Sequence, residues 1–365
     1  MVPKSPKGIL LFTLKIIVVW ILTSFLFQFI RTFGIEEMPY IEVTKKFNIG
    51  QIITLSLMIG SICGIFYSGI EILFNKPFFQ KLALGRLLLL KTLIYFLLVR
   101  LLFLFIVVFI GTQWENQSLN SQFIMETIRG KSFWVILVYF LVVSTMITFI
   151  LIVSQKFGPG MLWKFLIGKY HHPKEEERIF LFIDLKSSTT IAENLGHLNF
   201  SNLIQDCFFD LTDVIVQHQV DIYQYVGDEA VLSWEKARGV KDQRCIHAYF
   251  DFMKILNDRG EYYQNKYGVK PFFKAGLHFG TVMAAEVGVI KKEIAYHGDV
   301  LNTTARIQGE CNTYNQSLLA SEDIINDMDI NAPFTKEFVG EPVLKGKENR
   351  IKIYGIQSVS VVDGR

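Results

Sequence analysis

Four long apolar runs in the first half of the chain restrict its fold more than any other feature. They lie at about residues 9–30, 51–74, 87–111 and 133–154. Each run reaches the roughly 20 residues that a helix needs to cross the hydrocarbon core of a bilayer. A buried core of soluble helices would carry more charged residues than these runs do, so they predict a bundle of four transmembrane helices over residues 1–154.

Composition supports a lipid bilayer as partner and argues against nucleic acid. The 365 residues are 51% hydrophobic and 19% charged, whereas an ordinary soluble domain is roughly 25% charged. The formal net charge of +3 is too small to indicate a nucleic-acid partner. The four cysteines, Cys63, Cys207, Cys245 and Cys311, lie far apart without a CxxC pair. They indicate neither a zinc site nor a disulfide framework, and they fit a reducing compartment.

Charges around the runs predict the orientation in the membrane. Basic residues precede the first run, fill the second connection and follow the fourth run, whereas the first and third connections are balanced. The positive-inside rule therefore places both termini in the cytoplasm, as four spans of an inner membrane require. Within the runs, we expect Lys15, Glu71 and Lys91 to reach the membrane surface. Arg100 lies nearest mid-depth, either paired inside the bundle or functional.

Residues 155–177 join this region to a second domain. Gly158, Pro159 and Gly160 end the fourth helix. The apolar stretch 161–170 then carries two lysines, which fits either a short helix at the membrane surface or a plain structural linker. We expect a cytoplasmic domain over 178–357 and a short C-terminal tail over 358–365.

Strands and helices alternate in the second domain, which predicts an α/β sandwich with a central sheet. Its strongest local signal is the Gly227-Asp228 hairpin, and Thr190 with Glu193 forms a capping-box pattern at a helix start. The expected elements are a strand at 178–185, a helix ending near 217, a hairpin at 221–234, a helix at 240–267, two strands around Gly280 within 271–285, a helix at 299–312 and strands within 338–357.

Three short motifs in this domain carry residue types suited to phosphate chemistry. In the first motif, FIDL, Asp184 ends an apolar strand just before a helix N-terminus, a place that suits a hard cation and a phosphate. In the second, YVGDE, a turn presents Asp228, which could complete a two-cation site. In the third, GDVLNTTAR, Asn302 and Arg306 lie four apart on one helix face and could hold a ribose and a phosphoryl group. Each motif alone also has an ordinary structural explanation.

Together and in this order, the motifs resemble the class III adenylate and guanylate cyclase catalytic domain, over roughly residues 178–357. The segments GLHFG (276–280) and LKGK (344–347) match as well. The resemblance implies a ferredoxin-like α+β sandwich that converts a nucleoside triphosphate, ATP first, to a 3′,5′-cyclic nucleotide and pyrophosphate. It also implies a head-to-tail homodimer, with metal ligands from one protomer and the Asn/Arg pair from the other.

The resemblance assigns site residues one by one. Asp184, Asp228 and the Leu185 carbonyl would bind two Mg²⁺ or Mn²⁺ ions per site. Asn302 would orient the ribose, and Arg306 would stabilise charge on the α-phosphoryl group. Less specifically, Lys345 or Lys347 would contact the outer phosphates.

The positions that would read the base depart from the family pattern. Adenylate cyclases usually carry Lys and Asp or Thr there, and guanylate cyclases carry Glu and Cys or a similar small residue. This chain has Gln224 and Ala295. The Gln224 amide can both donate and accept hydrogen bonds, so it predicts weak discrimination between bases. GTP and pyrimidine triphosphates therefore remain possible substrates. The nearby Tyr223, Tyr225 and Tyr296 could stack on the base or lie in the core, and we expect core positions for them.

Two further hypotheses remain. One is a degenerate cyclase fold that binds nucleotide and regulates a partner, and it is motivated by Gln224 and Ala295. The other is a transporter or channel gated by the cytoplasmic domain, which four uninterrupted spans support least.

Overall fold

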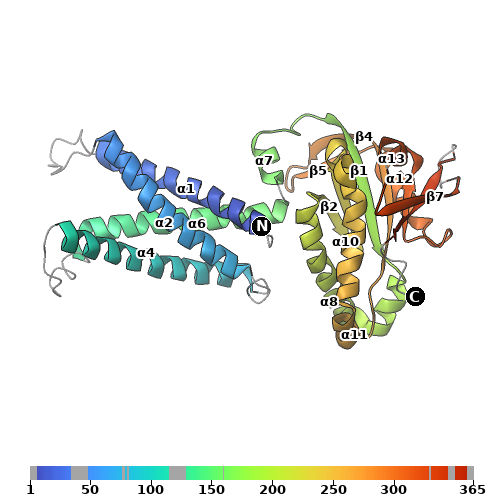
Figure 1. Cartoon of the computed structure of the whole chain (residues 1–365), viewed down its shortest axis with the longest axis horizontal. Coiled ribbons are helices and arrows are strands. Elements are labelled where there is room, and N and C mark those ends of the chain that lie inside the picture. Colours follow the sequence, from blue (N-terminus) through green and yellow to red (C-terminus); the bar gives the residue numbers. More distant parts are fainter. Residues whose placement is uncertain are drawn as a thin grey trace. The chain divides into compact units, whose positions relative to one another are not determined.

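The computed structural model describes residues 6–33, 48–75, 79, 82–114, 129–158, 160–328, 330–343 and 350–359. The chain divides into two compact units, Met1–Phe157 and Gly158–Arg365. Figure 1 shows that the first unit is helical and that the second contains all the strands.

The first unit contains four long helices, α1 (Pro6–Phe33), α2 (Ile49–Phe74), α4 (Leu84–Trp114) and α6 (Lys131–Phe157). Three segments are long and apolar enough to cross a membrane, Gly8–Arg31, Ile49–Phe74 and Phe133–Ser154. They match three of the four predicted runs. The run predicted at 87–111 lies within α4, whose side chains from 102 onward fall outside the described residues, so the fourth span stays a prediction.

Small residues allow α1 and α2 to pack closely. A Cβ atom at Gly60 would lie 2.5 Å from the Cα of Ile21, and one at Gly64 would lie 2.6 Å from the Cα of Ile17. This GxxxG spacing is a common way for apolar helices to bring their backbones together.

The charged residues inside this unit differ in part from the expectation. Lys15 and Arg100 are exposed, but Glu71 and Lys91 are each 5% exposed and do not reach the surface of the bundle. Lys91 Nζ lies 2.6 Å from Glu71 Oε2, and the Tyr95 hydroxyl donates to Glu71 Oε1 at 2.8 Å. The expectation that the Glu71 and Lys91 side chains reach the surface is therefore wrong, because both are buried and pair with each other between α2 and α4.

The second unit is built on one mixed sheet. The strands are β1 (Lys174–Leu185), β2 (Asp221–Val226), β3 (Glu229–Glu235), β4 (Phe273–Val287), β5 (Glu293–His297), β6 (Leu318–Ser321), β7 (Phe334–Gly340) and β8 (Ile353–Ser358). Their order is β2-β3-β1-β4-β6-β8-β7, and β5 pairs with β4. The β4–β6 pair is parallel, and the other pairs are antiparallel.

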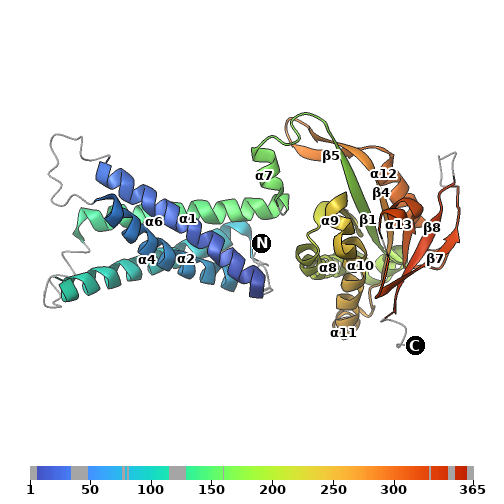
Figure 2. The same ribbon diagram turned by 45° about the horizontal axis from the view of Figure 1, so that its top comes forward.

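Helices cover both faces of this sheet. They are α7 (Met161–Leu166), α8 (Ser188–Gln217), α9 (Lys236–Val240), the 3-10 turn η1 (Lys241–Gln243), α10 (Arg244–Asp258), α11 (Gly260–Tyr267), α12 (Asp299–Gly309) and α13 (Glu322–Asp327). Figures 1 and 2 show α8 and α10 on one side of β1 and β4 and α12 on the other. The β1-α8-β2-β3-α10-β4 portion has the chain order and strand order of a ferredoxin-like fold, as predicted.

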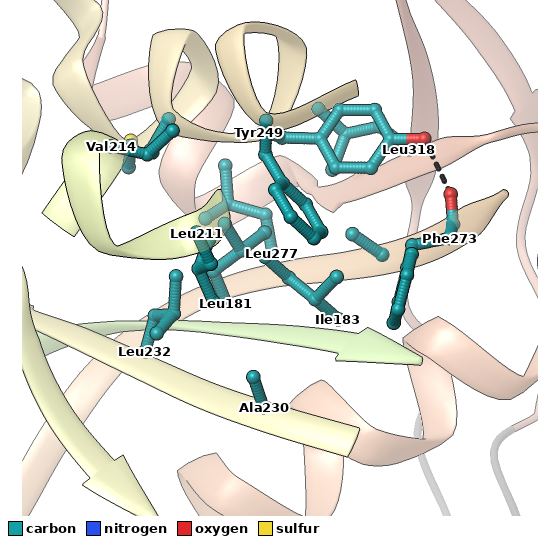
Figure 3. Packing of buried hydrophobic residues seen from close by; sticks show 14 of the residues in the cluster. Leu181, Ile183, Leu211, Val214, Ala230, Leu232, Tyr249, Phe273, Leu277 and Leu318 are labelled. Atoms are coloured by element: carbon teal, nitrogen blue, oxygen red, sulfur yellow. Dashed lines mark hydrogen bonds between the residues drawn. The ribbon is translucent and has the colours of Figure 1, made fainter. Parts of the chain in front are cut away.

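Successive side chains of β1 point to opposite faces of the sheet and so belong to two separate hydrophobic cores. Ile179, Leu181 and Ile183 pack against α8 and α10 in the larger core, part of which is drawn in Figure 3. Phe180 and Phe182 point to the opposite face, toward α12 and β5. Because side chains alternate along a strand, Asp184 shares this second face.

Several predicted boundaries need correction. β1 begins at Lys174, so the charged residues before 178 belong to the strand. Residues 273–287 form one strand rather than two. Gly280 is not a turn residue, because its place in the strand leaves room for the Val300 side chain, which would lie 2.6 Å from a Cβ at that position. α8 begins after Ser187, which has a φ of 58° and makes no side-chain cap, so the predicted capping box is absent. The helix predicted at 240–267 is divided among α9, η1, α10 and α11.

The linker packs on the second unit. Met161, Phe165 and Tyr170 join the core around Phe180 and Phe182. The opposite face of α7 exposes Trp163 and Leu166 at 66% and 71%. The linker is thus part of the folded domain.

Candidate active site

Two carboxylates meet where β1 ends. Asp184 pairs across the sheet with Glu229 at the start of β3. Asp228 precedes Glu229 in the β2–β3 turn, where Gly227 adopts a φ of +62°. The predicted hairpin is therefore confirmed, and its turn brings Asp228 beside Asp184.

Burial and mutual repulsion perturb these acids. Burial first, and then the neighbouring Asp228 carboxylate, raise the pKa of Asp184 to about 6. Burial raises the pKa of Glu229 to about 7, with further contributions from Asp184 and Asp228. The clustered negative charge is thus incompletely neutralised by the surrounding protein.

This arrangement fits a divalent cation. Asp228 Oδ2 is buried and has no hydrogen-bond partner in the described part of the chain. In the same part of the chain, no group of three or more His, Cys, Asp or Glu side chains is arranged to hold a metal. The protein therefore offers two carboxylates, and other ligands would be water, substrate oxygens or main-chain carbonyls, as is usual for Mg²⁺. The Leu185 side chain lies in the larger core, so only its main chain could contribute.

Sequence reasoning missed two residues beside Asp184. Gln308 of α12 donates from Nε2 to Asp184 Oδ2 at 3.3 Å. Lys274 of β4 lies opposite Asp184 in the sheet, and its charge acts to lower the pKa of that carboxyl. Lys274 Nζ also donates to Asn312 Oδ1 at 2.8 Å. Lys274 could have been found from the sequence, because it lies two residues before the GLHFG segment on a strand next to that of Asp184.

Helix α12 carries the predicted Asn/Arg pair. It packs closely on β4 because a Cβ at Gly276 would lie 2.5 Å from the Gln308 nitrogen. Thr304 and Gln308 are buried, whereas Asn302 is exposed and Arg306 is half-buried. Among the described residues, no hydrogen bond or ion pair joins Asn302 or Arg306 to the carboxylate pair. The structure thus brings Asp184 and Asp228 together and leaves the Asn/Arg pair away from them within one chain.

The predicted base positions lie on β2 and β5. Gln224 is exposed and pairs with Val231, and Ala295 is half-buried and pairs with Ala285. The rings of Tyr223 and Tyr296 lie 5.1 Å apart and connect these two strands. Both tyrosines pack in the core beside α12, as expected. Tyr225 is 45% exposed, and its ring lies 4.7 Å from that of Phe208, so its expected core position is wrong. The predicted phosphate contacts Lys345 and Lys347 lie outside the described residues.

The mixed sheet has two adjoining carboxylates at one strand end, and among the described residues a buried oxygen of Asp228 has no hydrogen-bond partner. Together with the helix that carries the Asn/Arg pair, this arrangement fits a nucleotide-cyclase type of domain. Residues 171–358 match the family model described as the adenylate and guanylate cyclase catalytic domain. The chain belongs to this family.

Individual relatives agree with the family. The chain is 37% identical over 226 residues to adenylate cyclase 2 of Rhizobium meliloti, covering 62% of each protein. It is 24% identical over 214 residues to adenylate cyclase 1 of the same organism, covering 56% of this chain and 30% of that protein. The chain therefore spans less than two thirds of the length of these relatives.

Solved structures show the same fold. A bacterial light-regulated adenylyl cyclase superposes with a TM-score of 0.53 at 17% identity, covering 63% of this chain and 67% of that one. A second structure of such a cyclase gives a TM-score of 0.51 at 20% identity, covering 60% and 64% of the two chains.

Proposed function

We propose that this protein is a membrane-anchored nucleotidyl cyclase that converts a nucleoside triphosphate, ATP first, to a 3′,5′-cyclic nucleotide and pyrophosphate. The observation that carries the proposal is the pair Asp184 and Asp228, in which a buried oxygen of Asp228 has no hydrogen-bond partner among the residues that the structure describes. ATP is favoured because the first two relatives are adenylate cyclases.

In the proposed reaction, the ribose 3′-oxygen forms a bond to the α-phosphorus, and the bond from that phosphorus to the β-phosphate bridging oxygen breaks. Two Mg²⁺ or Mn²⁺ ions, held by Asp184, Asp228 and the Leu185 carbonyl, would lower the pKa of the 3′-hydroxyl and bind the triphosphate. The hydroxyl proton leaves to solvent, and pyrophosphate departs.

The chain's own residues orient the substrate and stabilise charge. Asn302 would orient the ribose, and Arg306 would neutralise charge that develops on the α-phosphoryl oxygens. Gln224 and Ala295 would line the base site, and Lys345 or Lys347 would bind the outer phosphates.

The site is proposed to be complete only in a homodimer. Within one chain Asn302 and Arg306 lie on the side of α12 that faces away from the sheet, so a second copy would bring them to the carboxylates. Two equivalent sites then form across a twofold axis.

The proposed anchor has four spans, with both termini and the catalytic unit in the cytoplasm and the helices in the inner membrane. Three candidate spans, the length of α4 and the distribution of basic residues support it.

A direct assay tests the activity. Purified full-length protein with Mg²⁺ or Mn²⁺ is incubated separately with ATP, GTP, CTP and UTP, and products are identified by mass. We expect cyclic AMP from wild type and none from Asp228→Ala. If no cyclic nucleotide forms from any of the four, the regulatory alternative suggested by Gln224 and Ala295 replaces this proposal.

Mixing two inactive variants tests the composite site. Asp228→Asn and Arg306→Ala would each be inactive alone. If they are co-expressed, random pairing should restore about a quarter of wild-type activity, because half of the dimers hold one intact site. If activity does not return although the two variants associate, each site lies within a single chain.

A further inference from the structure

A second cluster of buried charges lies at the start of β1, six residues before Asp184. At its centre is Arg178, whose side chain is fully buried. Arg178 donates to Ser233 Oγ at 2.9 Å, to Glu176 Oε2 at 3.1 Å and to Asp221 Oδ2 at 2.8 Å. Its guanidinium carbon lies 4.7 Å from the ring centre of Tyr296.

The linker completes this cluster. Lys164 Nζ lies 3.4 Å from Asp221 Oδ2, and Lys169 Nζ lies 2.8 Å from Glu176 Oε1. The hydroxyl of Tyr170 donates to the same Glu176 carboxylate at 3.0 Å. Two lysines and one tyrosine from outside the sheet thus contact the two carboxylates that hold Arg178. Arg238 of α9 also donates to Asp221 Oδ2, at 2.8 Å. Glu235 Oε1 lies 4.0 Å from Lys164 Nζ and 3.2 Å from Lys169 Nζ.

These contacts depend on one another. Burial alone would raise the pKa of Asp221, but Arg178 and Lys164 outweigh it and the net shift is downward. The pKa of Glu176 is also lowered, because Lys169 and Arg178 outweigh its burial. Removing a partner from buried charges that satisfy one another leaves an uncompensated charge, so the neighbours move or admit water.

The cluster holds both strands that carry the proposed base positions. Asp221 is the first residue of β2, three residues before Gln224. Tyr296 follows Ala295 on β5. Since Tyr296 also contacts Tyr223, a shift of the Arg178 guanidinium would disturb β2 and β5 together.

We propose that Arg178 and Asp221 are positioning residues for the base site, and that Lys164 and Lys169 of the linker hold them in place. The contact of the linker with the domain then sets the affinity of the site for the nucleotide base. This inference rests on the proposed cyclase function, because the base site belongs to it.

The test compares three double variants of the full-length protein. Lys164→Met with Lys169→Met removes the two linker charges, and Lys164→Arg with Lys169→Arg keeps them. The matched control, Lys266→Met with Lys352→Met, removes two lysines that pair elsewhere with Asp206 and Glu322.

Two measurements are made on each variant. Amide hydrogen exchange reports on β2 and β5, and calorimetry gives the Kd of α,β-methylene ATP, a nucleotide that cannot be cyclised. For the methionine pair we expect about tenfold faster exchange in β2 and β5, and a Kd and a KM for ATP raised about fivefold or more. The kcat should change less than the KM. The arginine pair should stay near wild type, and so should the control.

The outcomes separate the inference from the function on which it rests. Unchanged exchange in β2 and β5, or faster exchange with an unchanged Kd, overturns the inference. Equal acceleration of exchange across the whole second unit also overturns it, because the lysines would then only stabilise the fold. If wild type binds nucleotide but forms no cyclic product, the proposed function fails while exchange and Kd still decide the inference.

Discussion

At the scale of single residues, the protonation of Asp184 controls the candidate metal site. Its pKa is raised from 3.8 to about 6 by burial and by Asp228, so the folded protein without a cation takes up a proton between these values. This contribution to stability is fully present below about pH 4 and is lost as the pH rises through about 6. A divalent cation binds the deprotonated form and reverses the loss.

We therefore predict that Mn²⁺ stabilises the protein more at pH 7.5 than at pH 5.5. At a concentration of 100 times the Kd, the gain is about 2.7 kcal/mol, which corresponds to roughly 5–10 °C in Tm for a domain of this size. Thermal unfolding of the full-length protein, with and without Mn²⁺, measures it. Asp228→Asn should abolish the shift, and an equal shift at both pH values would contradict the prediction.

Part of the geometry of the candidate site could be predicted from the sequence. Asp184 and Asp228 lie together as expected, because each lies in a short motif with a local signature. The roles of these two residues and of Asn302 and Arg306 stay predictions. Gln308 was missed because its contact with Asp184 joins residues 124 apart, and only the packing of α12 on the sheet creates it. Gln224 was placed on its strand, but no sequence pattern shows which base its amide would read.

At the scale of elements, the buried Glu71–Lys91 ion pair joins α2 to α4. Side chains of the surrounding core include Trp20, Tyr67 and Tyr95. Tyr67 stacks on Tyr95 at 4.7 Å, so the ion pair is enclosed by aromatic rings. Charges in such a place are costly unless they are paired.

We predict that Glu71→Gln or Lys91→Met alone lowers the free energy of unfolding by about 3–5 kcal/mol, because each leaves a buried charge unpaired. Exchanging the two residues, Glu71→Lys with Lys91→Glu, should recover part of the loss. Thermal unfolding in detergent micelles, followed by tryptophan fluorescence, measures this. Arg100→Met is the control, since that side chain is exposed. Single variants as stable as this control would show that the pair does not contribute.

Local sequence signals predicted the elements better than their ends. The Gly227 hairpin was placed correctly, because turn chemistry acts within a few residues. The start of the helix at Asp299 was also placed correctly. Gly280 was misread as a turn, since its role is to admit Val300 from a helix twenty residues later. Such close approaches depend on tertiary packing and leave no local signature.

At the scale of the whole molecule, the boundary between the two units lies near the start of the predicted linker, between Phe157 and Gly158. A cut near residue 170, within the predicted linker, would remove Met161 and Phe165 and truncate the core beside α12. The compact unit begins at Gly158.

We predict that a fragment of residues 158–365 is more stable than one of residues 171–365, by about 3 kcal/mol or more, because the shorter fragment loses large buried side chains. Chemical denaturation of the two fragments measures the difference. Equal stability would show that the linker contributes nothing to the stability of the domain.

The fragment of residues 158–365 should also be weakly active, and its activity should depend on concentration, because it must form dimers without the membrane helices. Full activity at high dilution would exclude the anchor as the dimerising element.

The first strand of the sheet has a mechanical consequence. β1 is paired with β4 along its whole length and with β3 from Arg178 onward, so it can neither bend nor stretch independently. Lys174 and Asp184 are its ends, and ten residues at about 3.3 Å each place them about 33 Å apart. A displacement applied at the first residue should therefore be transmitted to the last. In mechanical terms β1 would act as a stiff connection between the linker and a carboxylate of the candidate active site.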